Sequence, residues 1–196
     1  QYSNLAKNDA SGLQMWIENN AQETQQLTRI FNDKTDEEVS EWLATEKTQS
    51  DYLKQGYTIH YVDPGNESGA QIVASTDSSP KRSVNASEGK TVPVSSINQT
   101  VAAELADLQG SGNDIVLTEA YISEEGGSDY EGVHIAFIAT VGDPGTGEQR
   151  VVIYSVATKT YSSDLGTGLD DSGVAMVVND RDEVIMGSRS SSLHDS

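Results

Sequence analysis

Cysteine is absent from the chain, so it has no disulfide framework, no thiol nucleophile and no thiolate-bound metal. Basic residues are scarce: 12 Lys and Arg stand against 31 Asp and Glu, a formal net charge of −19. This balance argues against nucleic acid as a partner, because a phosphate-binding surface needs a basic patch. No apolar run approaches the ~18 residues that a membrane-spanning helix needs. The sequence begins with Gln and has no signal-peptide pattern, which favours a processed piece of a longer protein.

Acidic residues are spread along the whole chain, and this bears on where the protein works. A net charge of −19 on 196 residues exceeds what solubility requires, and in dilute buffer it makes the compact state repel itself. At molar salt the screening length falls to ~3 Å and most of the repulsion disappears. The composition therefore favours a protein adapted to concentrated salt over a merely acidic domain.

The first part of the chain has helical spacing. Apolar residues from about 2 to 31 recur mostly three and four positions apart, as a narrow stripe on one long helix. So thin a stripe is more typical of a helix that lies against a partner helix or projects from its domain than of a core helix. Thr35 and Glu38 form a capping box that opens a second helix, which Gly56 ends.

Strand patterns dominate after Gly56. Residues 57–62 and 71–76 flank turn residues and predict a hairpin, a polar loop follows at 77–93, and apolar spacing predicts a third helix over 97–108. Further strands are predicted at 115–122, 133–141 and 150–157, with a last hairpin at 173–178 and 180–186. The long strands are nearly continuously apolar, so we expect both sheet faces to be covered. The order predicts an α+β fold with helices against an antiparallel sheet.

Particular residues in this order carry a likeness to a known family. Residues 59–63 and 69–76 show the pattern strand, Asp, Gly, strand, Ala-Ser-Thr, and residues 119–123 match a third strand ahead of the two long ones. Residues 173–180 form a valine-rich strand followed by Asp and a turn. The chain thus resembles the Cache family of extracellular sensor domains, which have a PAS-like fold, and the last segment resembles the start of a second, membrane-proximal module.

The resemblance implies a ligand sensor rather than an enzyme. With the acidity, it implies the membrane-anchored ectodomain of a haloarchaeal transducer, either a chemotaxis receptor or a sensor histidine kinase. Residues 1–34 would be a membrane-leading helix, with the stripe on 13–31 as the seam of a homodimer. Residues 35–169 would be the sensor module, and 170–196 either its end or the start of a second one. A small molecule would bind on one sheet face, under the loop and helix after the first hairpin, and shift the population of helix positions at the membrane.

The chain departs from the family's amino-acid receptors at the residues that hold the ligand. Those receptors carry an Arg-x-Trp-Tyr run ahead of the third strand and an Asp on a later strand. Here the two tryptophans, Trp16 and Trp42, lie on the leading helices, and Ala157 stands in place of the Asp. The class of ligand is therefore open.

Candidate ligand contacts are the polar and aromatic side chains on the strands and in the loop over the expected pocket: Tyr121, His134, Arg150, Tyr154 and Arg82. Arg clamps a carboxylate bidentately, His adds a donor, and Tyr supplies a wall with a hydroxyl. Because successive side chains of a strand point to opposite faces of the sheet, His134 should point away from the face of Ile135, and Tyr154 away from the face of Ile153. Each has a plainer alternative: an exposed strand end or a carboxylate neighbour for Arg, a hydrogen-bonded structural side chain for His, and packing for Tyr.

Catalytic patterns are absent from the sequence. It has no Gly-x-Ser-x-Gly elbow, no His-Glu-x-x-His and no phosphate loop, and its three histidines are scattered. Residues 179–182 lack the Gly and closing Glu of a calcium loop. We therefore expect no enzyme, cofactor or metal. The leading hypothesis is an extracellular sensor domain for a small molecule, the alternative is a halophilic cell-surface structural or interaction domain without a ligand, and a hydrolase comes third.

Overall fold

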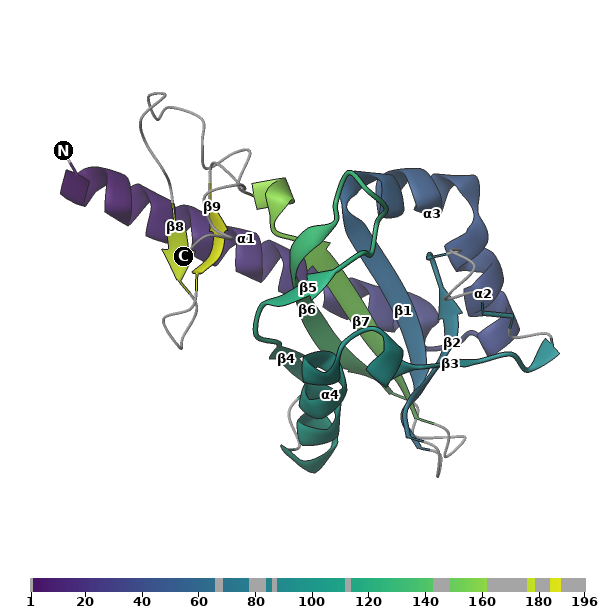
Figure 1. Ribbon diagram of the computed structural model, residues 1–196. Coiled ribbons are helices and arrows are strands. Elements are labelled where there is room, and N and C mark those ends of the chain that lie inside the picture. Colours follow the sequence, from purple (N-terminus) through teal and green to yellow (C-terminus); the bar gives the residue numbers. More distant parts are fainter. Residues whose placement is uncertain are drawn as a thin grey trace.

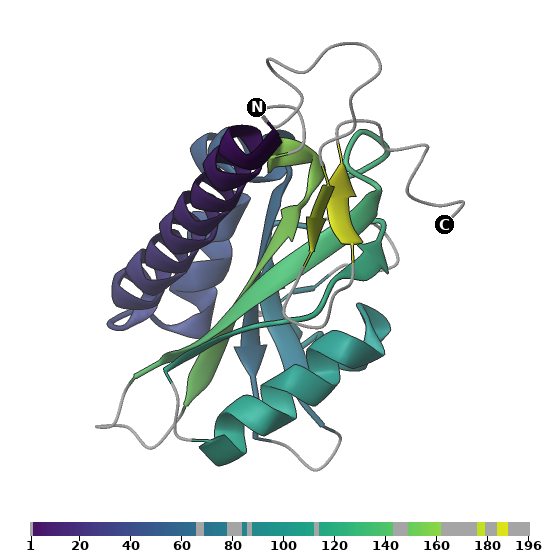
Figure 2. The same ribbon diagram turned by 90° about the vertical axis from the view of Figure 1, so that its left-hand side faces the viewer.

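A computed structural model of the chain describes residues 2–65, 69–77, 84–85, 88–111, 114–142, 149–161, 176–178 and 184–187. Within them a seven-stranded antiparallel sheet lies between helices (Figure 1). Figure 2 shows the long N-terminal helix on one face of the sheet and α4 on the other. The predicted α+β fold, with a long helix packed on one face of an antiparallel sheet, is confirmed.

The long helix α1 spans Tyr2–Phe31 and uses its apolar stripe inside the protein. Leu27 and Phe31 are fully buried against the sheet, and Trp16 and Ile17 pack partly buried against the same core. This corrects the expectation that so thin a stripe does not belong to a core helix, because Leu27 and Phe31 meet the chain's own strands. The seam of a homodimer along this helix stays a prediction. Among the described residues, none of the helices combines the length and apolar character that crossing a membrane requires.

The second helical region is broken, where the sequence predicted one helix up to Gly56. The capping box is confirmed: the Thr35 hydroxyl accepts from the Glu38 N–H at 3.2 Å, and the Glu38 carboxylate accepts from the Thr35 N–H at 3.2 Å. After α2 (Asp36–Ala44), Thr45 turns extended and its hydroxyl accepts from the Thr48 N–H, which starts α3 (Glu46–Asp51). A short 3-10 turn, η1 (Leu53–Gln55), then ends at Gly56 with φ +92°, in the left-handed region that favours glycine.

The sheet has the order β3-β2-β1-β7-β6-β4, and β5 also pairs with β6. Its strands are β1 Tyr57–Asp63, β2 Gln71–Ser75, β3 Val92–Pro93, β4 Ile115–Leu117, β5 Tyr121–Ser123, β6 Gly132–Val141 and β7 Arg150–Ala157. The prediction of one strand over 115–122 is wrong, because the chain leaves the ladder between β4 and β5. There the Thr118 hydroxyl accepts from the Ala136 N–H and donates to the Glu119 carbonyl.

Two shorter helical segments and a separate small sheet complete the described chain. The 3-10 turn η4 (Val94–Ser96) precedes α4 (Gln99–Ser111), which lies across the face opposite α1. Near the C-terminus β8 (Met176–Val178) pairs antiparallel with β9 (Val184–Gly187), in the segment predicted as a hairpin.

Alternation along the strands divides the core into two layers, so both faces of the sheet are covered, as predicted. Ile135, Phe137 and Tyr154 belong to the α1 layer, whereas Ala136, Ile138 and Ile153 belong to the α4 layer. The facing predicted for His134 and Tyr154 follows the same alternation. Towards the other end of the α4 face, polar side chains replace the apolar ones: Thr58, His60, His134 and Ser155.

Candidate functional site

A buried polar cluster occupies this end of the α4 face, and we call it the Glu125 cluster. It comprises His60 on β1, Tyr121 and Ser123 on β5, Glu125, His134 on β6 and Ser155 on β7. All six are buried, and Glu125, His60, His134 and Ser155 have no exposed surface. Strand pairing explains the gathering, since β6 lies between β5 and β7, and β7 lies between β6 and β1.

Glu125 lies at the centre of the cluster, although it belongs to the loop between β5 and β6. Its Oε1 is 2.5 Å from the His60 Nε2. Its Oε2 accepts from the hydroxyls of Ser123 at 2.8 Å, Ser155 at 2.6 Å and Tyr121 at 3.2 Å. Four side chains from three strands therefore point polar hydrogens at one carboxylate.

The hydrogen bonds of His60 fix which of its nitrogens faces Glu125 as a donor. Its Nδ1 lies 2.8 Å from the Ser75 hydroxyl, and that hydroxyl oxygen accepts from the Asp77 N–H at 3.0 Å. The Ser75 proton is thus available to the His60 Nδ1, which leaves the Nε2–H for Glu125. Ser75 holds the ring of His60 in the orientation that presents a donor to the carboxylate.

His134 approaches Glu125 from the other side of the cluster. Its Nε2 lies 2.8 Å from the Tyr130 carbonyl oxygen, which only accepts, so this nitrogen carries a hydrogen. Its Nδ1 lies 3.1 Å from the Ser155 hydroxyl, whose single proton is committed to Glu125 at 2.6 Å. The Ser155 oxygen also lies 2.7 Å from the Tyr121 hydroxyl, so Ser155 joins His134, Tyr121 and Glu125 in one hydrogen-bond network. The His134 Nδ1 lies 3.8 Å from the Glu125 Oε2, so a protonated His134 compensates the charge of the carboxylate inside the protein.

The carboxyl group of Glu125 is held in its ionised form. Burial raises its pKa, but the hydrogen bond from His60, electrostatic attraction to His60 and His134, and the hydrogen bond from Ser155 outweigh burial and lower the pKa to about 2. An ion pair buried in this way contributes little more to stability than apolar packing of the same volume would. Buried and strongly perturbed ionisable groups are instead typical of functional sites.

The structure brings together two of the five candidate residues from the sequence. Tyr121 and His134 belong to the cluster, their rings 6.1 Å apart. Tyr154 lies on the opposite sheet face, stacked on Tyr57 with ring centroids 5.6 Å apart, and burial raises its pKa far above the ordinary value. The Tyr154 hydroxyl therefore cannot share a pocket with His134 through this sheet.

The remaining candidates lie away from the cluster. Arg150 grips the Asp36 carboxylate with two hydrogen bonds of 3.0 and 2.9 Å, and Asp63 lies 3.8 Å away. Arg150 therefore fits the alternative given for it above, pairing with a neighbouring carboxylate, rather than a ligand contact. Arg82 lies outside the described residues.

Four members of the cluster were missed: His60, Ser123, Glu125 and Ser155. The one local signal is the Gly126-Gly127 pair directly after Glu125, with φ of +82° and +80°, which marks a tight turn at this point of the loop.

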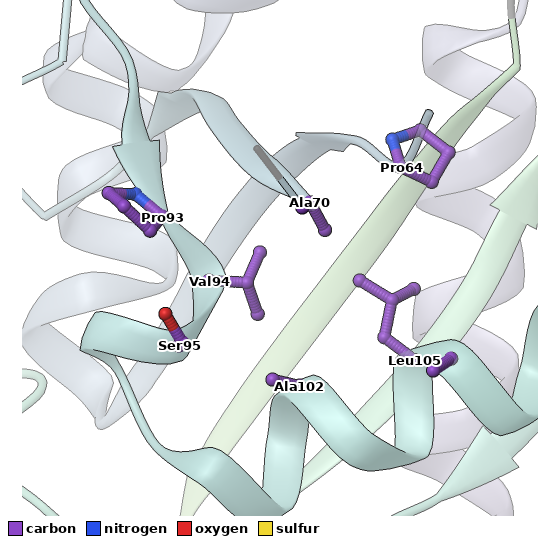
Figure 3. Close-up of a pocket in the computed structure, with 9 residues that line it drawn as sticks. Pro64, Ala70, Pro93, Val94, Ser95, Ala102 and Leu105 are labelled. Atoms are coloured by element: carbon purple, nitrogen blue, oxygen red, sulfur yellow. The ribbon is translucent and has the colours of Figure 1, made fainter. Parts of the chain in front are cut away.

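A separate open pocket of about 280 Å³ lies beside α4 (Figure 3). Its walls come from the first hairpin, the segment before α4 and α4 itself: Pro64, Gly69, Ala70, Pro93, Val94, Ser95, Ala102, Leu105 and Ala106. This is where the family resemblance locates a ligand. However, no ionisable side chain and none of the five candidate residues lines it. Among the described residues, no group of three or more His, Asp or Glu side chains is placed to hold a metal ion.

Comparison with known proteins gives likenesses of fold. No family model matches the sequence, and no curated protein matches it. The extracellular domain assigned to a histidine kinase, soHK1S-Z6, superposes with a TM-score of 0.53 at 16% identity, covering 98% of this chain and 72% of that one. The sensory domain of the Campylobacter jejuni chemoreceptor Tlp3 (CcmL), solved with isoleucine bound, gives 0.53 at 13% identity, covering 98% and 71%. The chain therefore shares its fold with the extracellular domain of the kinase and the sensory domain of the chemoreceptor.

Proposed function

We propose that this chain is the extracellular sensor domain of a transmembrane signalling receptor, which binds a small molecule and passes the event to a cytoplasmic output module by helix movement. The shared fold supports a sensory role. The single observation that carries the proposal is the Glu125 cluster, an ionised carboxylate buried with two histidines on one face of the sheet.

A purely structural domain gives no reason for this cluster. The α4 end of the same face is filled by apolar side chains such as Val62, Ile138 and Ile153. Apolar packing of this kind would serve stability as well at the cluster end, without removing charges from water. The ligand-free structural or interaction domain is therefore the second choice.

The packing also offers a route from the cluster to the leading helix. His134 and Ser155 project from one face of β6 and β7, and their strand neighbours Ile135 and Val156 project from the other face into the α1 layer. A ligand that prefers one spacing of these strands shifts the population of α1 positions. Homodimerisation through α1 and membrane anchoring of the full-length protein belong to this proposal, as does adaptation to concentrated salt.

A thermal-shift screen in molar KCl tests the proposal, using small carboxylates, amines and sugars. A ligand raises the Tm of wild-type protein as its concentration rises. We expect the shift to be lost in Ser155→Ala, which removes the hydroxyl that bonds to both Glu125 and His134. It should be kept in Ser128→Ala, which removes an exposed hydroxyl of the neighbouring loop.

Two results contradict the proposal in different ways. If no compound shifts the Tm of folded protein, the ligand-free structural domain is favoured. If a shift persists in Ser155→Ala, the ligand binds elsewhere, and the pocket beside Ala102 and Leu105 takes the place of the cluster as the site.

A further inference from the structure

Glu125 is set apart from the rest of its loop. The loop over residues 124–131 is acidic and mostly exposed, and Glu125 alone in it is fully buried. Glu124 on one side is exposed, and Gly126 and Gly127 on the other side have positive φ, which allows the backbone to turn sharply away from the sheet. A surface loop thus inserts one carboxylate into the protein.

The other contacts of this loop are at its far end, where the Tyr130 ring lies so near Gly56 that a Cβ there would be 2.8 Å from it. The Tyr130 carbonyl accepts from His134, and the Asp129 carbonyl accepts from the exposed Lys159 ammonium at 3.1 Å. Short, exposed segments with few buried contacts open locally at small free-energy cost compared with global unfolding. Among the residues of this loop, Glu125 therefore provides the one fully buried anchor.

The groups that bind this carboxylate do not belong to the 124–131 loop. His60, Ser155 and Tyr121 lie on β1, β7 and β5, where strand pairing holds their backbone in the sheet independently of the loop. Without the carboxylate the His60 Nε2–H would be a buried donor with nothing to accept from it, which costs free energy, whereas the Tyr121 and Ser155 hydroxyls, 2.7 Å apart, would still bond each other. On the same face, opposite Ser155 in the ladder, the buried Thr58 hydroxyl has no hydrogen-bond partner among the described residues. The floor of the cluster is thus a set of donors arranged for a carboxylate.

We propose that Glu125 is a tethered occupant of a carboxylate-binding site, and that a free small monocarboxylate takes its place when the 124–131 loop withdraws. The inference rests on the proposed function and names its ligand class. Beyond Cα the Glu125 side chain is two methylene groups and a carboxylate, so propionate has its size, its charge and its hydrogen-bonding pattern. The loop then acts as a built-in competitor that sets how much ligand is needed.

The test compares propionate binding with and without the internal competitor. Chloride is replaced stepwise by propionate at constant molar salt, and the Tm is followed for wild type, Glu125→Ala and Glu124→Ala. Glu124→Ala removes the same charge from an exposed neighbour, so it controls for net charge and for general salt effects.

We expect propionate to raise the Tm of the wild type, and to do so in Glu125→Ala at a concentration at least about tenfold lower, because a tethered group competes at millimolar or higher effective concentration. Glu124→Ala should respond as the wild type does, and Ser155→Ala added to Glu125→Ala should abolish the gain. The proposal is overturned if Glu125→Ala responds no better than Glu124→Ala. It is equally overturned if only Glu125→Ala responds and the wild type does not, since Glu125 is then a permanent structural carboxylate.

A second measurement does not depend on any variant folding. Wild-type protein is titrated with propionate and with propionamide, which has the same shape and no charge. Stabilisation by propionate alone supports the proposal, and equal effects of the two compounds contradict it. If the wider screen instead finds an amine or a sugar whose shift is lost in Ser155→Ala, the sensor function stands and the carboxylate inference fails.

Discussion

Replacing Glu125 by Gln should change how the stability of the protein depends on pH. The substitution keeps the size of the side chain and removes the negative charge that His60, His134 and Ser155 surround. It therefore separates the contribution of this one ionisation from those of the other acidic residues. Glu124→Gln, at an exposed position next in sequence, is the matched control.

The expected size follows from the lowered pKa of Glu125. In the folded protein the pKa is about 2, against an ordinary value of 4.5. A lowered folded-state pKa contributes stability that is fully present above pH 4.5 and is lost as the pH falls through the folded-state value. At about 1.4 kcal/mol per pKa unit, the difference corresponds to about 3 kcal/mol, of which about 2 kcal/mol is lost between pH 4.5 and pH 3.

Urea unfolding in molar KCl measures this directly, since Trp16 and Trp42 both pack against the core and report its loss by fluorescence. Between about pH 5 and pH 3 the wild type and Glu124→Gln should lose about 2 kcal/mol more than Glu125→Gln does. Parallel stability curves for wild type and Glu125→Gln over this range would refute the assignment of an ionised carboxylate held by the cluster.

Three further substitutions test other parts of the structure. Arg150→Ala should destabilise the protein by about 1 kcal/mol through loss of the bidentate pair with Asp36, and it should leave ligand-induced Tm shifts unchanged. A double-mutant cycle with Asp36→Asn, followed by urea unfolding, measures the coupling energy of the pair. Additive effects of the two substitutions would show that the pair contributes nothing to stability. Phe31→Ala should cost about 3–5 kcal/mol in urea unfolding, because the ring is fully buried in the α1 layer, and a cost below about 1 kcal/mol would mean that α1 does not pack there. Gly56→Ala should cost about 1–3 kcal/mol, since φ is +92° and a Cβ there would lie 2.8 Å from the Tyr130 ring; an unchanged Tm would contradict this.

Local signals in the sequence predicted the elements of the fold well. The capping box at Thr35 and the apolar stretches of β6 and β7 each depend on residues close together in the chain. The two misplaced boundaries, at Thr45 and Thr118, have one physical cause. In both places a threonine hydroxyl bonds to backbone groups and interrupts a helix or a strand whose apolar pattern continues.

The use of the α1 stripe could not be predicted in the same way. Leu27 and Phe31 have the same spacing whether they face a second helix or the chain's own sheet. Only the tertiary packing shows that they lie in the core with Ile135 and Tyr154.

The sequence predicted only part of the candidate site. Tyr121 and His134 stand out as polar or aromatic side chains among apolar strand residues, and alternation gives the facing of His134. Glu125 has no such mark, because it is one acidic residue in an acidic loop of an acidic chain. Its contact with His60, 65 residues away, depends on β1 and β6 lying on either side of β7, which a single sequence does not reveal.

Amide hydrogen exchange of the 124–131 loop, measured in chloride and in propionate at the same molar salt, tests most directly whether the Glu125 cluster is where this protein senses a ligand. We predict that propionate lowers protection in the loop as Glu125 is displaced, while β7 stays protected. Unchanged exchange in the loop, or a change confined to the pocket near Pro64 and Ala102, would contradict it.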